Sequence, residues 1–135
     1  MTHGDRLVLA VLAVGVVGWA GLRYHTFVGE PVVWTDTRLY EQVAAASLWS
    51  GGFWAGPRTW GLPLLYKLVS GDSHRALAQF LIADFCWLAL AVASARAVCA
   101  RLLRVAVFGL VLAFSLLPVI IQWESDLMSD SLGLS

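Results

Sequence analysis

The chain has 135 residues, of which 59% are hydrophobic and only 13% are charged. Nine basic residues balance nine acidic ones, so the chain has no net charge that would attract nucleic acid. So few charges cannot cover the surface of a soluble domain. Together with a mean hydropathy of +0.75, they indicate an integral membrane protein.

Three long apolar segments occupy residues 7–22, 76–95 and 105–123. Each approaches the roughly 20 residues that a helix needs to cross about 30 Å of hydrocarbon. The sequence therefore predicts an all-α membrane protein, with three transmembrane helices in one membrane domain over residues 1–135. The first segment could instead be a secretory signal peptide, but the later segments favour an uncleaved signal anchor.

The orientation follows from the connection between the second and third segments. Residues 96–104 contain Arg96, Arg101 and Arg104 and no acid. Short connections rich in arginine stay in the cytoplasm. We therefore expect a multi-pass protein of the cell membrane with a cytoplasmic amino terminus. The loop over residues 23–75 then faces the non-cytoplasmic side, as does the chain after the third segment.

The outer loop is predicted to begin with a helix. Asp36 and Thr37 are suitable N-caps for residues 38–50, where apolar residues recur at helical spacing. Gly51 and Gly52 are expected to end this helix.

A second apolar stretch of the loop covers residues 64–69, after Pro63, and Gly71 separates it from the second transmembrane segment. The loop also contains four tryptophans, which suit the membrane–water interface: Trp34, Trp49, Trp54 and Trp60. We therefore expect the loop helices to lie along the membrane surface.

Asp36 is the first candidate for chemistry. At the start of a surface helix, its carboxylate could act as a general base on a hydroxyl of a lipid-soluble or membrane-proximal substrate. It could also serve only as the N-cap of that helix. On position alone, the capping role is favoured.

A group of acids, Glu124, Asp126 and Asp130, follows the third segment on the same predicted side. Clustered carboxylates can bind a divalent cation through their oxygens, or can share acid–base work. They can also be simply the solvated start of a helix. The sequence leaves a divalent cation open and indicates no other cofactor.

Asp84 lies near the middle of the second segment. An aspartate at that depth costs about 2.5–3.5 kcal/mol, whereas each Leu, Ile, Phe or Val contributes about 0.3–0.6 kcal/mol in favour of insertion. The helix should therefore turn its polar face, with Gln79, toward other protein. This favours oligomerisation or further helices. Asp84 could lie on a proton or ion path, or it could equally be a buried, hydrogen-bonded structural acid.

The outer loop as a whole resembles a known family. Its runs are residues 36–44 (DTRLYEQVA), 48–53 (LWSGGF) and 56–65 (GPRTWGLPLL). They are similar to the first periplasmic loop of the GT-C superfamily of glycosyltransferases, which use polyprenyl-phosphate sugars. Protein O-mannosyltransferases and lipid A aminoarabinose transferases are members. Residues 129–132 (SDSL) resemble the acid-Ser-Leu element that follows the third span in these enzymes.

The resemblance implies roles for four residues. Asp36 would be the catalytic base that deprotonates the acceptor hydroxyl for an inverting transfer from the polyprenyl-phosphate donor. Asp130 would be the second active-site acid. Arg58 would help to hold the donor phosphate, and Tyr40, four residues after Asp36, would belong to the substrate-binding part of the motif. Members have many more spans, so we expect the amino-terminal portion of a larger module, inactive by itself.

Two other functions stay open. The chain could be a small non-catalytic membrane protein or a subunit of a complex, in which Asp84 pairs with a basic residue on a partner helix. It could also belong to a transporter with Asp84 on an ion path, although the interfacial helices and the absence of broken spans disfavour this.

Overall fold

The computed structural model describes the backbone of residues 3–27, 35–54 and 61–125. Side chains are described within these ranges except at residues 3–5, 7–9, 35–36 and 122–125. The described residues form helices and no strands, so the predicted all-α class is confirmed. The helices are α1 (His3–Thr26), α2 (Thr35–Ala45), α3 (Gly51–Trp54), α4 (Gly61–Leu68), α5 (Asp72–Arg96), α6 (Arg101–Phe114) and α7 (Pro118–Ser125).

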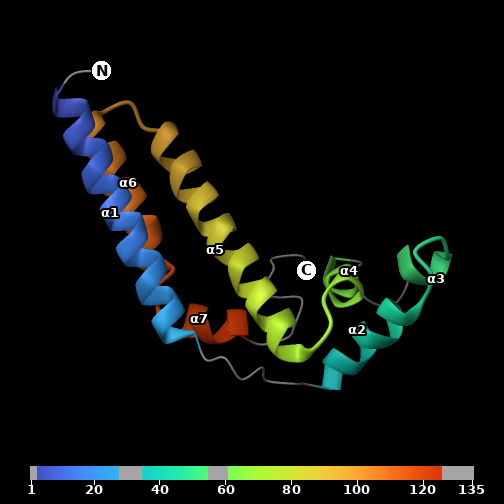
Figure 1. The fold of residues 1–135 in the computed structure, drawn as a ribbon. Coiled ribbons are helices and arrows are strands. Elements are labelled where there is room, and N and C mark those ends of the chain that lie inside the picture. Colours follow the sequence, from blue (N-terminus) through green and yellow to red (C-terminus); the bar gives the residue numbers. More distant parts are fainter. Residues whose placement is uncertain (1–2, 28–34, 55–60, 126–135) are drawn as a thin grey trace.

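Helices α5 and α6 form an antiparallel hairpin, and α1 runs beside α6 (Figure 1). Trp19 of α1 packs against Ala91 of α5 and Leu112 of α6, which makes the small apolar core of this bundle. Most other residues of α1 stay exposed; Val14, for example, is 73% exposed. The first helix therefore rests on the hairpin through a short contact near Trp19.

Helix α5 is long and apolar enough to cross a membrane, and it is the one helix that meets this description among the residues the structure describes. It contains the whole predicted second segment, residues 76–95. The predicted first segment, residues 7–22, lies within α1. With 24 residues, α1 is about 36 Å long at about 1.5 Å per residue.

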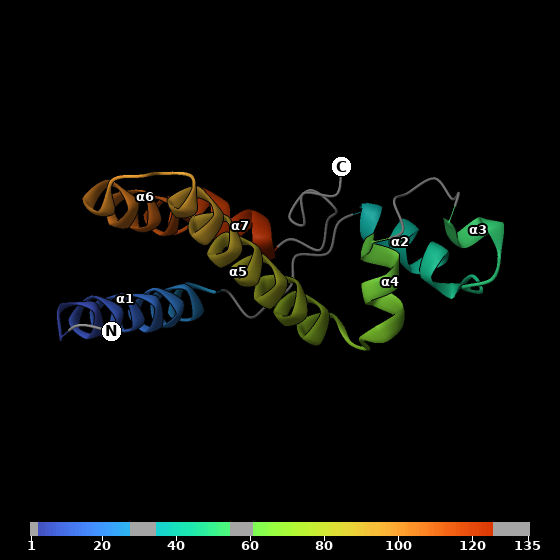
Figure 2. The ribbon, with the colours of Figure 1, turned by 90° about the horizontal axis from the view of Figure 1, so that it is seen from above.

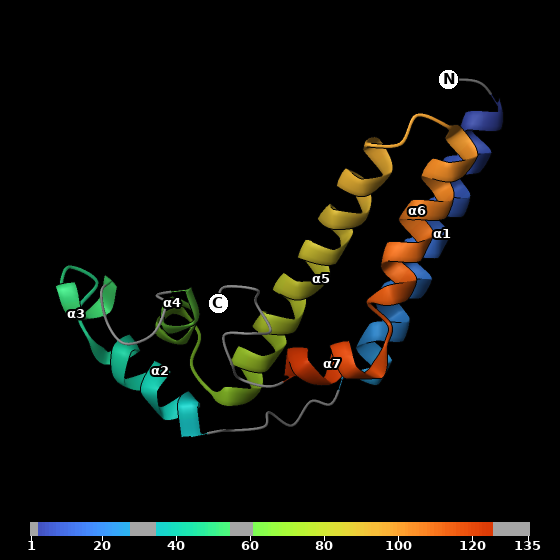
Figure 3. The same cartoon turned by 180° about the vertical axis from the view of Figure 1, so that it is seen from behind.

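The predicted third segment, residues 105–123, is not one helix. Helix α6 ends at Phe114, and α7 begins at Pro118 and runs in a different direction (Figure 3). Pro118 has no N–H to donate to the carbonyl of Phe114, so the helix cannot continue in register. Leu117 instead donates to Phe114 at 3.1 Å, an i→i−3 hydrogen bond that tightens the last turn.

The outer loop contains helices, as predicted, but with different boundaries. Helix α2 begins at Thr35 and ends at Ala45, well before Gly51 and Gly52, which open α3 instead of ending α2. A local turn replaces the last predicted turn of helix, because the Ser50 hydroxyl donates to the Ser47 carbonyl at 2.7 Å.

Helices α2, α3 and α4 form a separate group at the far end of α5 from the α5–α6 turn (Figures 1 and 2). Gly71 joins α4 to α5 with a positive φ of 86°. This conformation favours glycine, since a Cβ would be strained there. Gly71 thus allows the sharp change of direction between the two helices.

Candidate functional site

Helix α2, which carries Asp36 and Tyr40, is anchored at its carboxyl end by Lys67 of α4. The Lys67 ammonium donates to the carbonyls of Ala44 at 2.9 Å and Ala46 at 2.8 Å. These carbonyls belong to the helix terminus, where intrahelical donors run out and the helix dipole is negative. One lysine thus supplies both the missing donor and the matching charge.

Arg75, in the first turn of α5, joins three helices. Its guanidinium pairs with Glu41 of α2 at 3.0 Å and with Asp72 at 2.9 Å. It also donates to the carbonyls of Val69 and Tyr66 at the end of α4. The guanidinium lies 4.3 Å from the centroid of the Tyr66 ring, within cation–π range.

An apolar core lies beneath these ionic contacts. Tyr40 is 1% exposed and packs with Ala44, Leu62, Tyr66 and Ala76. The two tyrosine rings meet edge to face, with centroids 6.3 Å apart. Burial raises the pKa of the Tyr66 phenol; Arg75 opposes this shift, and the carboxylates of Asp72 and Glu41 add to it.

The backbone of Asp36 lies in the first turn of α2 rather than in front of it, since the helix already begins at Thr35. Its position is still suited to an acid, because a carboxylate in the first turn is favoured by the helix dipole. The side chain of Asp36 and the whole of Arg58 and Asp130 lie outside the described residues.

Tyr40 is therefore the one predicted site residue with a described side chain. Its buried ring faces Tyr66, and its role toward a substrate stays a prediction. The described residues contain no group of three or more His, Cys, Asp or Glu side chains that could hold a metal ion. The acids Glu124, Asp126 and Asp130 do not enter that statement, because their side chains are not described.

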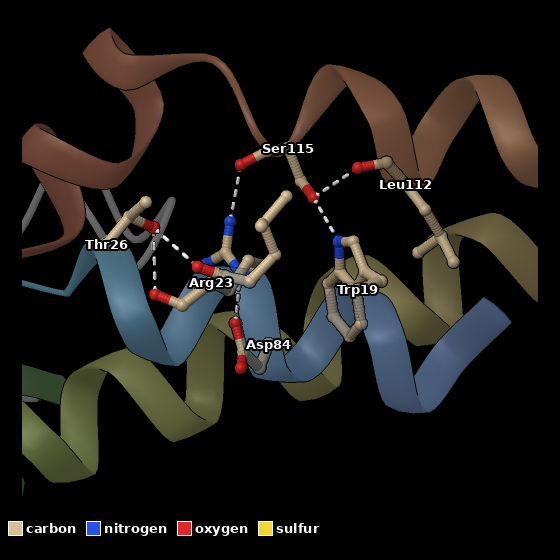
Figure 4. A network of polar contacts seen from close by, with 7 residues as sticks. Trp19, Arg23, Thr26, Asp84, Leu112 and Ser115 are labelled. Carbon is tan, nitrogen blue, oxygen red and sulfur yellow. Dashed lines mark hydrogen bonds and ion pairs between the residues drawn. The ribbon is translucent and has the colours of Figure 1, made fainter. Parts of the chain in front are cut away.

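A second polar site lies inside the bundle of α1, α5 and α6 (Figure 4). Arg23 of α1 is fully buried, and its Nε donates to the carboxylate of Asp84 on α5. Its guanidinium lies 5.5 Å from the Trp19 ring and 5.2 Å from the Phe80 ring. Asp84 thus has its basic partner within the same chain, not on a partner helix.

The same arginine contacts the break between α6 and α7. The Nη1 of Arg23 donates to the carbonyl of Ser115 at 2.5 Å. In an uninterrupted helix, that carbonyl would accept a hydrogen bond from the N–H four residues later. A buried carbonyl without a hydrogen bond costs about 1–3 kcal/mol, and Arg23 supplies the donor that the break takes away from Ser115.

Ser115 also holds α1 through its side chain. Its hydroxyl accepts from the Trp19 indole at 2.8 Å and donates to the Leu112 carbonyl at 2.7 Å. Both hydrogen bonds are buried. One residue at the end of α6 therefore contacts two side chains of α1 that lie four positions apart.

Sequence reasoning missed Arg23, which was assigned to the outer loop as a flank of the first segment. A usable signal was present: an arginine at the end of one apolar segment and an aspartate inside the next can neutralise each other. One argument against a transporter was that none of the predicted spans is broken. The break at Pro118, inside the predicted third segment, removes that argument.

Comparison with known proteins adds no family assignment. No protein-family model matches this chain. No curated protein and no solved structure matches it.

Proposed function

We propose that this chain supplies the amino-terminal helices and first outer loop of a membrane glycosyltransferase that uses a polyprenyl-phosphate sugar. The observation that carries the proposal is the anchoring of α2. Lys67 binds its carboxyl end and Arg75 binds Glu41 on its side, so the helix that begins at Thr35 is held on α4 and α5. A general base needs such a fixed support.

In this proposal Asp36 removes the proton from the acceptor hydroxyl. The oxygen then attacks the anomeric carbon of the sugar with inversion, the bond from that carbon to the phosphate oxygen breaks, and polyprenyl phosphate leaves with the electron pair. Asp130 is the second acid of the site, and Arg58 neutralises the donor phosphate, for which a guanidinium is well suited. Tyr40 contributes to substrate binding as part of the same motif.

The membrane arrangement belongs to the proposal. Helix α5 crosses the bilayer, α1 crosses beside it, and the group of α2, α3 and α4 lies on the non-cytoplasmic surface, with the amino terminus in the cytoplasm. Helix α6, with 14 residues, is about 21 Å long and cannot cross about 30 Å of hydrocarbon unaided. A third crossing would therefore need more than α6 alone.

The proposal is tested in the native membrane of cells that carry the gene. Sugar transfer from a radiolabelled polyprenyl-phosphate donor to endogenous acceptors is measured for Asp36→Asn and, as the control, for Gln42→Ala. Loss of a general base lowers the rate by about 10²–10⁴-fold, so Asp36→Asn should abolish detectable transfer. Gln42→Ala changes an exposed residue of the same helix that takes no part in the Lys67 and Arg75 contacts, and it should retain most activity. Full activity in Asp36→Asn, with normal membrane insertion, rejects the assignment.

The alternative function, a non-catalytic subunit, depended on Asp84 reaching a partner helix. Asp84 pairs with Arg23 of its own chain, so it does not need a basic residue of a partner helix. A partner subunit or further transmembrane helices would have to bind another surface. We therefore keep the glycosyltransferase as the proposed function.

A further inference from the structure

The end of the bundle opposite α2 carries a group of arginines. Arg96 closes α5, Arg101 opens α6, and Arg104 lies one turn further on; all three are exposed. The Arg104 guanidinium is fixed to the turn by two hydrogen bonds to the carbonyl of Val98, at 3.0 and 3.1 Å. The sequence has no acid between Asp84 and Glu124, so the middle and end of α5, the turn and α6 add no negative side chain to this group.

An apolar groove of about 400 Å³ leads along the outer face of α5 to one of these arginines. The groove is lined by Phe85, Leu88, Ala89, Val92, Ala93 and Arg96. Ala89 and Ala93 are the smallest of the lining residues, and we call the part of the groove that they line its floor. The groove faces away from the buried side of α5, which is formed by residues such as Ala83 and Ala91.

We propose that this groove and the arginine turn bind an anionic membrane phospholipid. One acyl chain lies along α5 between Phe85 and Val92, and the phosphate headgroup meets Arg96. The fit rests on charge and position together. A cation stands at the end of an apolar track on the helix that is long enough to cross a bilayer. Headgroup phosphates lie at the ends of such helices, and a guanidinium suits them.

The arginines also explain why an anionic lipid is preferred to a neutral one. Each basic residue near the surface of an anionic leaflet contributes about 1 kcal/mol to the attraction. A zwitterionic headgroup has the same phosphate but carries a compensating cation, which the arginine turn would repel. The apolar track would accept the acyl chain of either lipid. Two lipids that share their acyl chains should therefore differ in affinity only through the charge of their headgroups.

The full chain in mild detergent is titrated with phosphatidylglycerol or with phosphatidylcholine of the same acyl chains, and bound lipid is counted by native mass spectrometry. Wild type should bind phosphatidylglycerol more tightly. Arg96→Gln should weaken phosphatidylglycerol about fivefold and leave phosphatidylcholine unchanged. Ala89→Trp, which fills the floor of the groove without changing charge, should weaken both lipids.

Arg38→Gln is the matched control, because it removes an exposed arginine from α2 at the other end of the molecule. Equal binding of both lipids to wild type overturns the proposal. So does an equal loss in Arg38→Gln and Arg96→Gln, which would reflect net charge alone. Unchanged binding in Ala89→Trp would show that the acyl chain does not lie in the groove, which also contradicts the proposal. Displacement of the lipid by inorganic phosphate or by a phosphopeptide would assign the turn to another ligand and overturn the lipid assignment.

Discussion

Arg23 and Asp84 form an ion pair between α1 and α5, 61 residues apart in the chain, and the arginine is fully buried. Each charge alone would be costly inside an apolar bundle, whereas the pair can be retained when its remaining hydrogen-bonding groups are satisfied. The carbonyl of Ser115 provides such a group for Arg23. The pair therefore links the placement of α1 to the position of the break after α6.

The first prediction concerns the removal of one partner. Arg23→Met or Asp84→Leu alone should destabilise the bundle by up to about 3–5 kcal/mol, because each breaks an ion pair whose arginine is fully buried and leaves the other charge without its counter-charge. The double variant should be less destabilised than the sum of the two single variants. Unfolding in sodium dodecyl sulfate, followed by circular dichroism of the purified chain in micelles, measures this double-mutant cycle. Additive losses would show that the two side chains do not interact.

The second prediction concerns the support of α2. Lys67→Met keeps the apolar stem but removes the ammonium that binds the Ala44 and Ala46 carbonyls. A typical hydrogen bond is worth about 1 kcal/mol net, and the solvent exposure of Lys67 keeps the contribution of its charged donor near that value. Hydrogen exchange at the last amides of α2 should therefore accelerate about fivefold. Arg38→Met, which removes an exposed cation from α2 itself, is the control. Equal exchange in both variants would mean that Lys67 does not hold the helix.

Much of the fold could be predicted from local sequence, because apolar runs of the right length specify helices wherever they pack. Residues 7–22 and 76–95 both lie inside observed helices. The break at Pro118 was also a local signal, since a proline cannot continue a helix. The prediction of one continuous helix over residues 105–123 gave more weight to the apolar run, which continues on both sides of Pro118.

Other features could not be predicted because they depend on tertiary contacts. Helix α2 ends at Ala45, and its last carbonyls are bound by Lys67, more than 20 residues later in the chain. Arg23 reads as a loop residue until α5 brings Asp84 beside it. The predicted site stays largely a prediction, since the side chains of Asp36, Arg58 and Asp130 lie outside the described part of the chain.

The third prediction concerns the turn between α4 and α5. Gly71→Ala should destabilise the protein by about 1–2 kcal/mol, because a Cβ is unfavourable at its φ of 86°. The added methyl group would meet His74 at 3.5 Å, an ordinary contact, so the cost comes from the backbone. Gly109→Ala is the matched control. Its Cβ would meet nothing within 4 Å in the middle of α6, so it should be neutral or stabilising by up to about 1 kcal/mol. Similar losses in both variants, measured by the same unfolding assay, would contradict this account.

The last prediction concerns alkaline pH. Burial raises the pKa of Tyr66 above its ordinary value of 10.0, so the folded protein keeps the phenolic proton at a pH where the unfolded chain has lost it. Because the folded state then binds more protons, the free energy of unfolding must fall as pH rises above about 10. Tyr66→Phe removes the titrating group and should lessen this fall while leaving stability at neutral pH nearly unchanged. Unfolding in micelles across the alkaline range gives the comparison, with Tyr24→Phe as the control because Tyr24 is 67% exposed. If Tyr24→Phe lessened the fall as much as Tyr66→Phe, the effect could not be assigned to the buried phenol between α2 and α5.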